Sequence, residues 1–171
     1  MADPDLYTLA LTAPVPAAAL AAPLTVRCLA AFPDTPATRA HLYTLVRQGV
    51  LDTPGHSGDF PDQCFFDTHI FGPSYRAEAD TQVLALDGDA WVGLSSLRRT
   101  ETPGRSSFGL TAVQPAYRGR GIARTLKMHA LHLASARGDH TVTTEVHPLN
   151  TAMVRVNAHL GFVRADAGAF H

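Results

Sequence analysis

Hydrophobic and polar positions alternate near the start of the chain. In residues 6–12, Tyr7, Leu9 and Leu11 fall on one side and smaller or polar residues on the other, a two-residue period that predicts a β-strand. Residues 13–23 are rich in alanine and proline and predict a linker. A second strand is predicted over residues 24–32.

Apolar residues then recur at helical spacing. Residues 36–49 carry an apolar stripe, preceded by Asp34 or Thr35 as a cap, and Pro36 suits the first helical turn. A second, short helix is expected after Asp62 and should end at the Gly-Pro pair at residues 72–73. The loop between the two helices is rich in proline, glycine and aspartate.

The pattern changes to strands in the middle of the chain. Strands are predicted over residues 82–86, 90–97 and 106–113, and an Asp-Gly pair between the first two is typical of a tight hairpin. The three should therefore form an antiparallel meander. Further along, the expected order is a helix over 122–136, a strand over 141–146, a helix over 150–159 and a strand over 162–165.

Composition and charge predict one folded domain without a nucleic-acid partner. The 171 residues are 46% hydrophobic and 17% charged, the net charge is −1 and the pI is about 6.7. One third of the chain nevertheless holds a group of basic residues, either a local patch for an anion or an ordinary solvated surface. These residues are Arg98, Arg99, Arg105, Arg118, Arg120, Arg124 and Lys127.

Other functional classes have little support in the sequence. Cys28 and Cys64 form no paired motif, so we expect two reduced thiols in a cytoplasmic protein. No segment has the length and apolar character of a signal peptide or a membrane span. His129 and His132 lie one helical turn apart without an indicated third ligand, so no metal site is expected.

An Arg-Gly-Arg-Gly run, residues 118–121, joins the strand that ends near residue 113 to the helix that starts near residue 122. Glycine lets a backbone approach a ligand closely, and the free N–H groups at a helix start stabilise an anion. The P-loop pattern and the dinucleotide-binding glycine pattern are both absent from the sequence. From the residues alone, a phosphate loop and a purely structural turn both remain open.

The order of elements and two motifs resemble the GNAT superfamily of acyl-CoA N-acyltransferases. The family's pyrophosphate motif, Q/R-x-x-G-x-G/A, is matched by Arg118, Gly121 and Ala123, and Asn150 with the Leu-Gly-Phe at 160–162 resembles its second motif. Residues 144–162 further resemble the mycothiol synthase-like and tandem branch of the superfamily.

This resemblance implies an α+β fold. Its mixed, mostly antiparallel sheet would be splayed between the fourth and fifth strands, here residues 106–113 and 141–146, and flanked by helices. The acyltransferase domain would span residues 24–171, preceded by the strand and linker of residues 1–23.

The resemblance also implies acetyl-CoA as co-substrate. The backbone at Thr111, Ala112 and Val113 would pair with the pantetheine arm, and Asn150 would lie near that arm or the helix of the second motif. The N–H of Val113 would polarise the thioester carbonyl. The pyrophosphate would be held by the amides of Arg118, Gly119, Arg120, Gly121, Ile122 and Ala123.

The implied reaction is direct attack on acetyl-CoA by a primary amine of a small molecule or a peptide. Glu145 is the first candidate for the general base and His147 the second. Asn157 stands where many members have a tyrosine that protonates the leaving thiolate, and it would offer only a hydrogen bond. The alternative function is therefore a non-catalytic, CoA-binding regulatory module.

The end of the chain also departs from the family. The fold usually finishes with two strands after the last helix, and the nine residues after Phe162 supply only one. The alternating strand at residues 6–12 would fill the vacant place, either from the same chain or from a partner in a homodimer.

Overall fold

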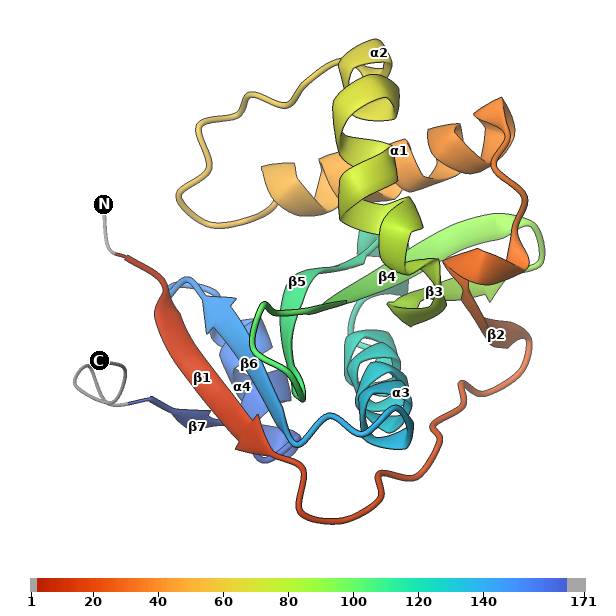
Figure 1. Ribbon diagram of the computed structural model, residues 1–171. Helices are drawn as coiled ribbons and strands as arrows, with labels where there is room; N and C mark the ends of the chain where they lie inside the picture. Colours follow the sequence, from red (N-terminus) through yellow and green to blue (C-terminus); the bar gives the residue numbers. More distant parts are fainter. Residues whose placement is uncertain (1–2, 166–171) are drawn as a thin grey trace.

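The computed structural model describes residues 3–165, which form a seven-stranded sheet flanked by helices on both faces (Figure 1). The spatial order is β2-β3-β4-β5-β6-β1-β7, and every neighbouring pair is antiparallel except β5 and β6. The α+β class and the central meander are thus confirmed. The strands are β1 (Asp5–Ala10), β2 (Leu24–Cys28), β3 (Gln82–Asp87), β4 (Ala90–Arg99), β5 (Arg105–Val113), β6 (Thr141–Val146) and β7 (Val163–Arg164).

Four α-helices accompany the sheet in the described part of the chain: α1 (Pro36–Leu51), α2 (Gln63–Phe65), α3 (Ile122–Ala136) and α4 (Thr151–His159). Thr35 caps α1, because its side chain accepts a hydrogen bond of 3.2 Å from the N–H of Thr38. Asp62 caps α2 in the same way through the N–H of Phe65, at 2.9 Å. Within residues 3–165, none of the helices is both long and apolar enough to cross a membrane.

The sheet separates two hydrophobic cores. On one face, α1 and the π-helical segment Phe66–Tyr75 pack on β4 and its neighbours through side chains that include Leu42, Phe66 and Leu94. On the other face, α3 packs on β3, β4 and β5 through Leu126, Ala130 and other apolar residues at helical spacing. Figure 1 shows these two layers, with α4 behind β6.

Two element boundaries predicted from the sequence are wrong. The second strand stops at Cys28 and continues as a short 3-10 helix, Leu29–Ala31, whose first residue is fully buried. The helix after α2 does not end at residues 72–73 but runs through Pro73 to Tyr75. Phe71 and Tyr75 are buried in the core, and this burial stabilises the continuation of the helix to Tyr75. The stabilisation outweighs the tendency of the Gly-Pro pair to end a helix.

The N-terminal strand fills the vacant place in the sheet from its own chain. β1 pairs along its whole length with β6, from Asp5↔Val146 to Ala10↔Thr141, and its other edge pairs with β7. Its alternation is as predicted, since Tyr7, Leu9 and the following Leu11 pack on the core below α3. No partner strand is needed to complete this edge.

The linker that follows β1 is fastened to α3. The Nδ1 atoms of His129 and His132 lie 3.1 Å and 2.7 Å from the carbonyl oxygens of Ala18 and Val15, so both imidazoles donate a hydrogen bond to the linker backbone. The N–H of Val15 in turn donates to the hydroxyl of Ser135 at 3.4 Å. Residues 11–23 therefore lie along α3, and the histidines predicted not to bind metal serve here as backbone tethers.

The predicted splay between β5 and β6 is confirmed. Their parallel pairing runs only from Arg105↔Thr141 to Phe108↔Thr144. Beyond Phe108, β5 contains one residue more than β4 over the same stretch, a bulge that bends the strand. Residues 109–113, the upper half of β5, are consequently unpaired on the side that faces β6.

Candidate functional site

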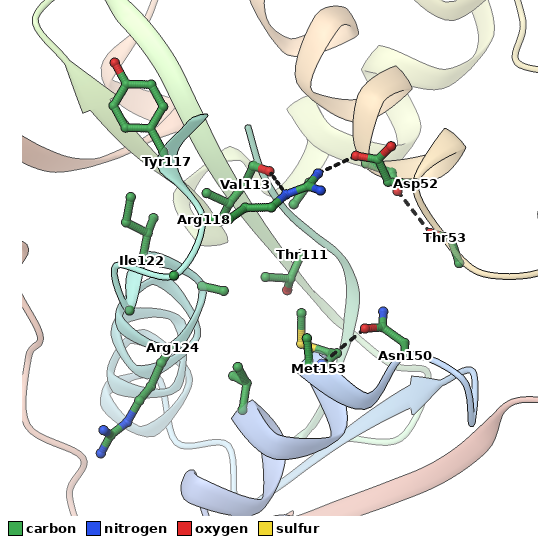
Figure 2. A pocket seen from close by; sticks show the side chains of 17 residues that line it. Asp52, Thr53, Thr111, Val113, Tyr117, Arg118, Ile122, Arg124, Asn150 and Met153 are labelled. Atoms are coloured by element: carbon green, nitrogen blue, oxygen red, sulfur yellow. Dashed lines mark hydrogen bonds and ion pairs between the residues drawn. The ribbon is translucent and has the colours of Figure 1, made fainter. Parts of the chain in front are cut away.

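A cavity of about 390 Å³ opens where β5 and β6 diverge (Figure 2). Its wall is built from the C-terminal end of α1, the upper half of β5, the loop before α3, the first turn of α3 and one side of α4. The structure brings all the predicted cofactor-binding residues except Arg120 to this wall. They are Thr111, Ala112, Val113, Arg118, Gly119, Gly121, Ile122, Ala123 and Asn150.

The glycine loop gives this cavity an anion-binding end. Gly119 and Gly121 both have φ of 75°, a left-handed conformation that favours glycine, and a Cβ at either position would meet no atom within 4 Å. Gly121 is also the N-cap of α3, and no side chain caps this helix. The first helical hydrogen bond joins the N–H of Thr125 to the carbonyl of Gly121 at 3.0 Å. The amides of residues 122–124 therefore lack partners within the helix and are available to an anion.

The upper half of β5 presents free backbone groups to the same cavity. The N–H of Gln114 donates to the carbonyl of Val92 at 2.9 Å, which makes Gly93 and Val113 a non-hydrogen-bonded pair of the antiparallel ladder. Hydrogen-bonded and non-hydrogen-bonded pairs alternate along an antiparallel ladder, so Ser95 and Thr111 form the next non-hydrogen-bonded pair. Residues of such a pair turn their N–H groups away from the partner strand. The N–H groups of Thr111 and Val113 therefore point away from β4, toward β6. An extended ligand lying along β5 would find two donors there.

An ion pair spans the cavity between the glycine loop and α1. Arg118 binds the carboxylate of Asp52 through Nη2, and its Nε donates to the carbonyl of Val113 at 2.9 Å (Figure 2). The pKa of Asp52 is lowered, chiefly by the hydrogen bond from Arg118 and then by one from Gln48. The sequence did not predict that α1 contributes to the wall of this cavity. Gly49 explains its position, since a Cβ there would come within 2.4 Å of the Cβ of Ala112.

Replacement of Asp52 by asparagine is expected to tighten CoA binding by about two- to fivefold, because Arg118 would no longer be shared with a carboxylate of the protein. Because the pKa of Asp52 is lowered from its ordinary value, its carboxylate stays ionised over the whole range above pH 4. The ratio of the two dissociation constants should therefore stay constant from pH 8 to about pH 4. Calorimetric titration with CoA measures this, with Asp59→Asn, an exposed carboxylate of the same loop, as the control. Weaker binding by the Asp52 variant would contradict the competition.

Two predicted cofactor residues use their side chains locally. Asn150 lines the cavity, but its Oδ1 accepts a hydrogen bond of 3.2 Å from the N–H of Met153 and so caps α4. Arg120 lies outside the cavity wall: its Nη2 donates to the carbonyl of Ala116 at 3.1 Å, and its guanidinium lies 5.1 Å from the centroid of the Tyr117 ring. Both side chains hold the surrounding backbone in place.

The three predicted catalytic residues lie around the cavity and not in its wall. Glu145 is exposed and is the first residue of β6 beyond the last pair with β5. The imidazole of His147 packs against the loop after α1, where a Cβ on Gly55 would come within 3.3 Å of its Nε2. Asn157 is fully buried below the cavity. The structure thus places Glu145 at the mouth of the splayed region, whereas His147 is partly buried against the loop after α1 and Asn157 is fully buried.

Comparisons with known proteins agree with this architecture. The chain is 31% identical over 110 residues to a mycothiol acetyltransferase from Corynebacterium glutamicum, a match that covers 63% of this chain and 37% of that protein. It therefore spans little more than a third of the length of this curated relative. The same name is carried by a relative from Mycobacteroides abscessus, 30% identical over 113 residues that cover 66% of this chain and 36% of that protein.

Solved structures with the same fold include a GCN5-related N-acetyltransferase from Sphaerobacter thermophilus, with a TM-score of 0.74 and 22% identity over 95% of this chain and 48% of that one. A diaminobutyrate acetyltransferase from Paenibacillus lautus, solved with its substrate and coenzyme A, has a TM-score of 0.61 and 20% identity over 80% of this chain and 74% of that one. The model of the acetyltransferase (GNAT) family matches residues 49–162, which include the whole cavity wall. The chain belongs to the acetyltransferase (GNAT) family.

Proposed function

We propose that this protein transfers the acetyl group of acetyl-CoA to a primary amine of a small molecule or a peptide. The observation that carries the proposal is the cavity between β5 and β6, which has an uncapped helix start at one end and free strand amides along its side. A diphosphate and an extended amide-containing arm are the two parts of CoA that these features suit.

The amides of residues 118–123 would bind the pyrophosphate, and the arm would lie along Thr111 and Val113 like an added strand. The N–H of Thr111, which lies farther from the glycine loop than that of Val113, would then donate to the thioester oxygen and stabilise the negative charge that develops when the amine attacks. Arg118, which already contacts the carbonyl of Val113, would add a positive charge near the pyrophosphate end of the arm.

Glu145 would accept the proton of the attacking amine. The side chains of Val142, Thr144 and Val146 are buried on the face of β6 that packs toward α3, so Glu145 points to the opposite, open face. It is also the first residue of β6 past the point where β5 separates. An amine that approaches the splayed region from this open face would meet the carboxylate directly or through one water molecule.

A second candidate function is a CoA-binding module without transferase activity. One observation favours it: the position of the usual acid holds Asn157, whose amide side chain has no proton to give to a leaving thiolate. Binding of CoA combined with no thiol release from acetyl-CoA for any amine would support this reading.

The proposed function is tested by release of free CoA thiol from acetyl-CoA in the presence of a panel of small-molecule amines and peptides. Binding of CoA is first established by calorimetry. We expect binding together with amine-dependent thiol release and a product heavier by one acetyl group. Absence of CoA binding would overturn both candidate functions.

Glu145→Gln is expected to lower kcat for the best amine by about a hundredfold, since general-base catalysis contributes factors of this size. The dissociation constant for CoA should remain unchanged, because Glu145 does not line the cofactor cavity. Steady-state kinetics and calorimetry measure the two quantities. The matched control is Glu101→Gln, which removes an exposed carboxylate from the turn between β4 and β5, at the end of β5 opposite the cavity. Equal kcat values for the two variants would exclude Glu145 as the base.

A further inference from the structure

The only lysine of this chain is buried. The other thirteen residues of the Lys and Arg total are arginines. The expectation that Lys127 belongs to a group of basic surface residues is wrong, because it is 1% exposed on α3. Its Nζ lies 4.0 Å from the centroid of the Phe108 ring and 5.4 Å from that of the Phe162 ring. Within residues 3–165 no carboxylate forms an ion pair with it.

Asn157 is a second buried polar group in the same region. Its side chain is fully buried, and neither its Oδ1 nor its Nδ2 has a hydrogen-bond partner among the described residues. Phe162 links it to the lysine, because the N–H of Phe162 donates to the carbonyl of Asn157 at 3.0 Å while its ring faces Nζ. A buried amide without a hydrogen-bond partner and a buried amine without a counter-charge are each destabilising, which argues for a ligand that both groups contact.

Both groups lie directly below the cofactor cavity. Lys127 follows Ala123 by one turn of α3, and Asn157 follows Met153 by one turn of α4; Ala123 and Met153 both line the cavity. Phe108, under the lysine, is the last residue of β5 that pairs with β6. An arm that starts at the glycine loop and runs down β5 therefore brings its sulfur end toward Lys127 and Asn157.

We propose that Lys127 is the proton donor to the sulfur of CoA, with the side-chain amide of Asn157 as a second hydrogen-bond donor to that sulfur. The inference rests on the proposed acetyl transfer. When the tetrahedral intermediate collapses, the carbon–sulfur bond breaks, its electron pair stays on sulfur, and one proton moves from Nζ to sulfur. The proton lost by the attacking nitrogen goes to Glu145 and solvent, and solvent returns one to Lys127.

The surroundings of Lys127 suit this role. Burial without a counter-charge lowers the pKa of Lys127 to about 7, and no charged side chain from β3, β4, β5 or α4 contributes to that shift. An ammonium group with this pKa is a stronger acid than an ordinary thiol, whose pKa is about 8.5, so proton transfer to the leaving thiolate is favourable. Asn157 alone could stabilise the thiolate but has no proton to give.

The test follows the thiol of bound CoA, which requires no acceptor. The pKa of that thiol is measured by the ultraviolet absorbance of the thiolate in complexes with the wild-type protein, Lys127→Met and Arg155→Met. Methionine replaces the lysine with a flexible apolar chain of similar length, and Arg155 is an exposed cation on α4 outside the cavity wall. We expect a thiol pKa at least one unit higher in Lys127→Met than in the other two proteins.

A second measurement needs no substitution. Because the chain has one lysine, lysine labelled with carbon-13 at Cε gives one side-chain signal. The pKa of Lys127 read from this signal should be higher in the complex with CoA than in the free protein, because the CoA thiolate pairs with the ammonium group. In the complex with a CoA analogue that lacks the sulfur atom, this pKa should not change. For an amine found by the panel, Lys127→Met should lower kcat about tenfold or more.

The outcomes separate the two proposals. Equal thiol pKa values in wild-type and Lys127→Met complexes, or equal lysine titrations with and without sulfur, would overturn the role of Lys127 while leaving acetyl transfer intact. Failure of the wild-type protein to bind CoA would overturn both.

Discussion

Gly121→Glu is expected to abolish measurable CoA binding, with a dissociation constant at least about a hundredfold higher than that of the wild-type protein. Gly121 is the N-cap of α3 and is one of the residues that line the cavity. A glutamate there would place a carboxylate where the pyrophosphate is expected, and its side chain would fill the space that is open above the loop. Both effects act on the ligand and leave the protein core untouched.

The backbone effect of this substitution can be separated from its effect on the ligand. Any side chain at a φ of 75° is strained by about 1 kcal/mol, so the variant should also be slightly less stable. Gly138→Glu provides the matched control, because Gly138 has φ of 92°, an equally open environment and a position beyond the opposite end of α3. It should lose similar stability and bind CoA normally.

Calorimetric titration with CoA and thermal unfolding of the free proteins give the two readouts. Gly121→Ala completes the series, since it adds the backbone strain without charge and should weaken binding only severalfold. Unchanged affinity in Gly121→Glu would show that the loop before α3 does not hold the pyrophosphate, and the proposed function would lose its central observation.

Removal of residues 1–22 is expected to prevent stable folding. β1 lies between β6 and β7, so its loss exposes the whole edge of β6 and separates β7 from the sheet. Tyr7, Leu9 and Leu11, together with Val15 and Leu20 of the linker, pack on the core under α3. Partial burial of five such side chains contributes about 5 kcal/mol, comparable to the whole stability of many domains.

Thermal unfolding and size-exclusion chromatography of a chain that begins at Pro23 measure this. A point substitution tests the same contact without removing the strand. Leu9→Ala, on the core side of β1, should lower Tm by about 5 °C. Thr8→Ala, on the opposite face of the same strand, should lower it by less than about 2 °C. If the shortened chain were as stable and as monodisperse as the full one, β1 would not be part of the folded unit.

Local sequence signals predicted most of the elements correctly. Alternation identified the strand that contains Tyr7 and Leu9, and the Asp-Gly pair identified the hairpin between β3 and β4. The cap of α1 was narrowed to Asp34 or Thr35, of which Thr35 is the one used, and the short helix was expected to start after its cap, Asp62. The glycine loop was also evident, because its requirement for positive φ at Gly119 and Gly121 depends on those residues themselves. Such features are decided within a few residues of the chain, where periodicity and backbone chemistry act directly.

The sequence by itself therefore determined the α+β order of elements, the glycine loop and, through its motifs, the resemblance to the GNAT family. Only the tertiary structure decided that β1 pairs with β6 and β7, because an alternating strand fits any open sheet edge equally well. It also decided that α1 contributes Asp52 to the cavity and that Lys127 and Asn157 lie buried beneath it. Whether a polar side chain meets water or the core depends on which surfaces pack together, and that is fixed by contacts between residues far apart in the sequence.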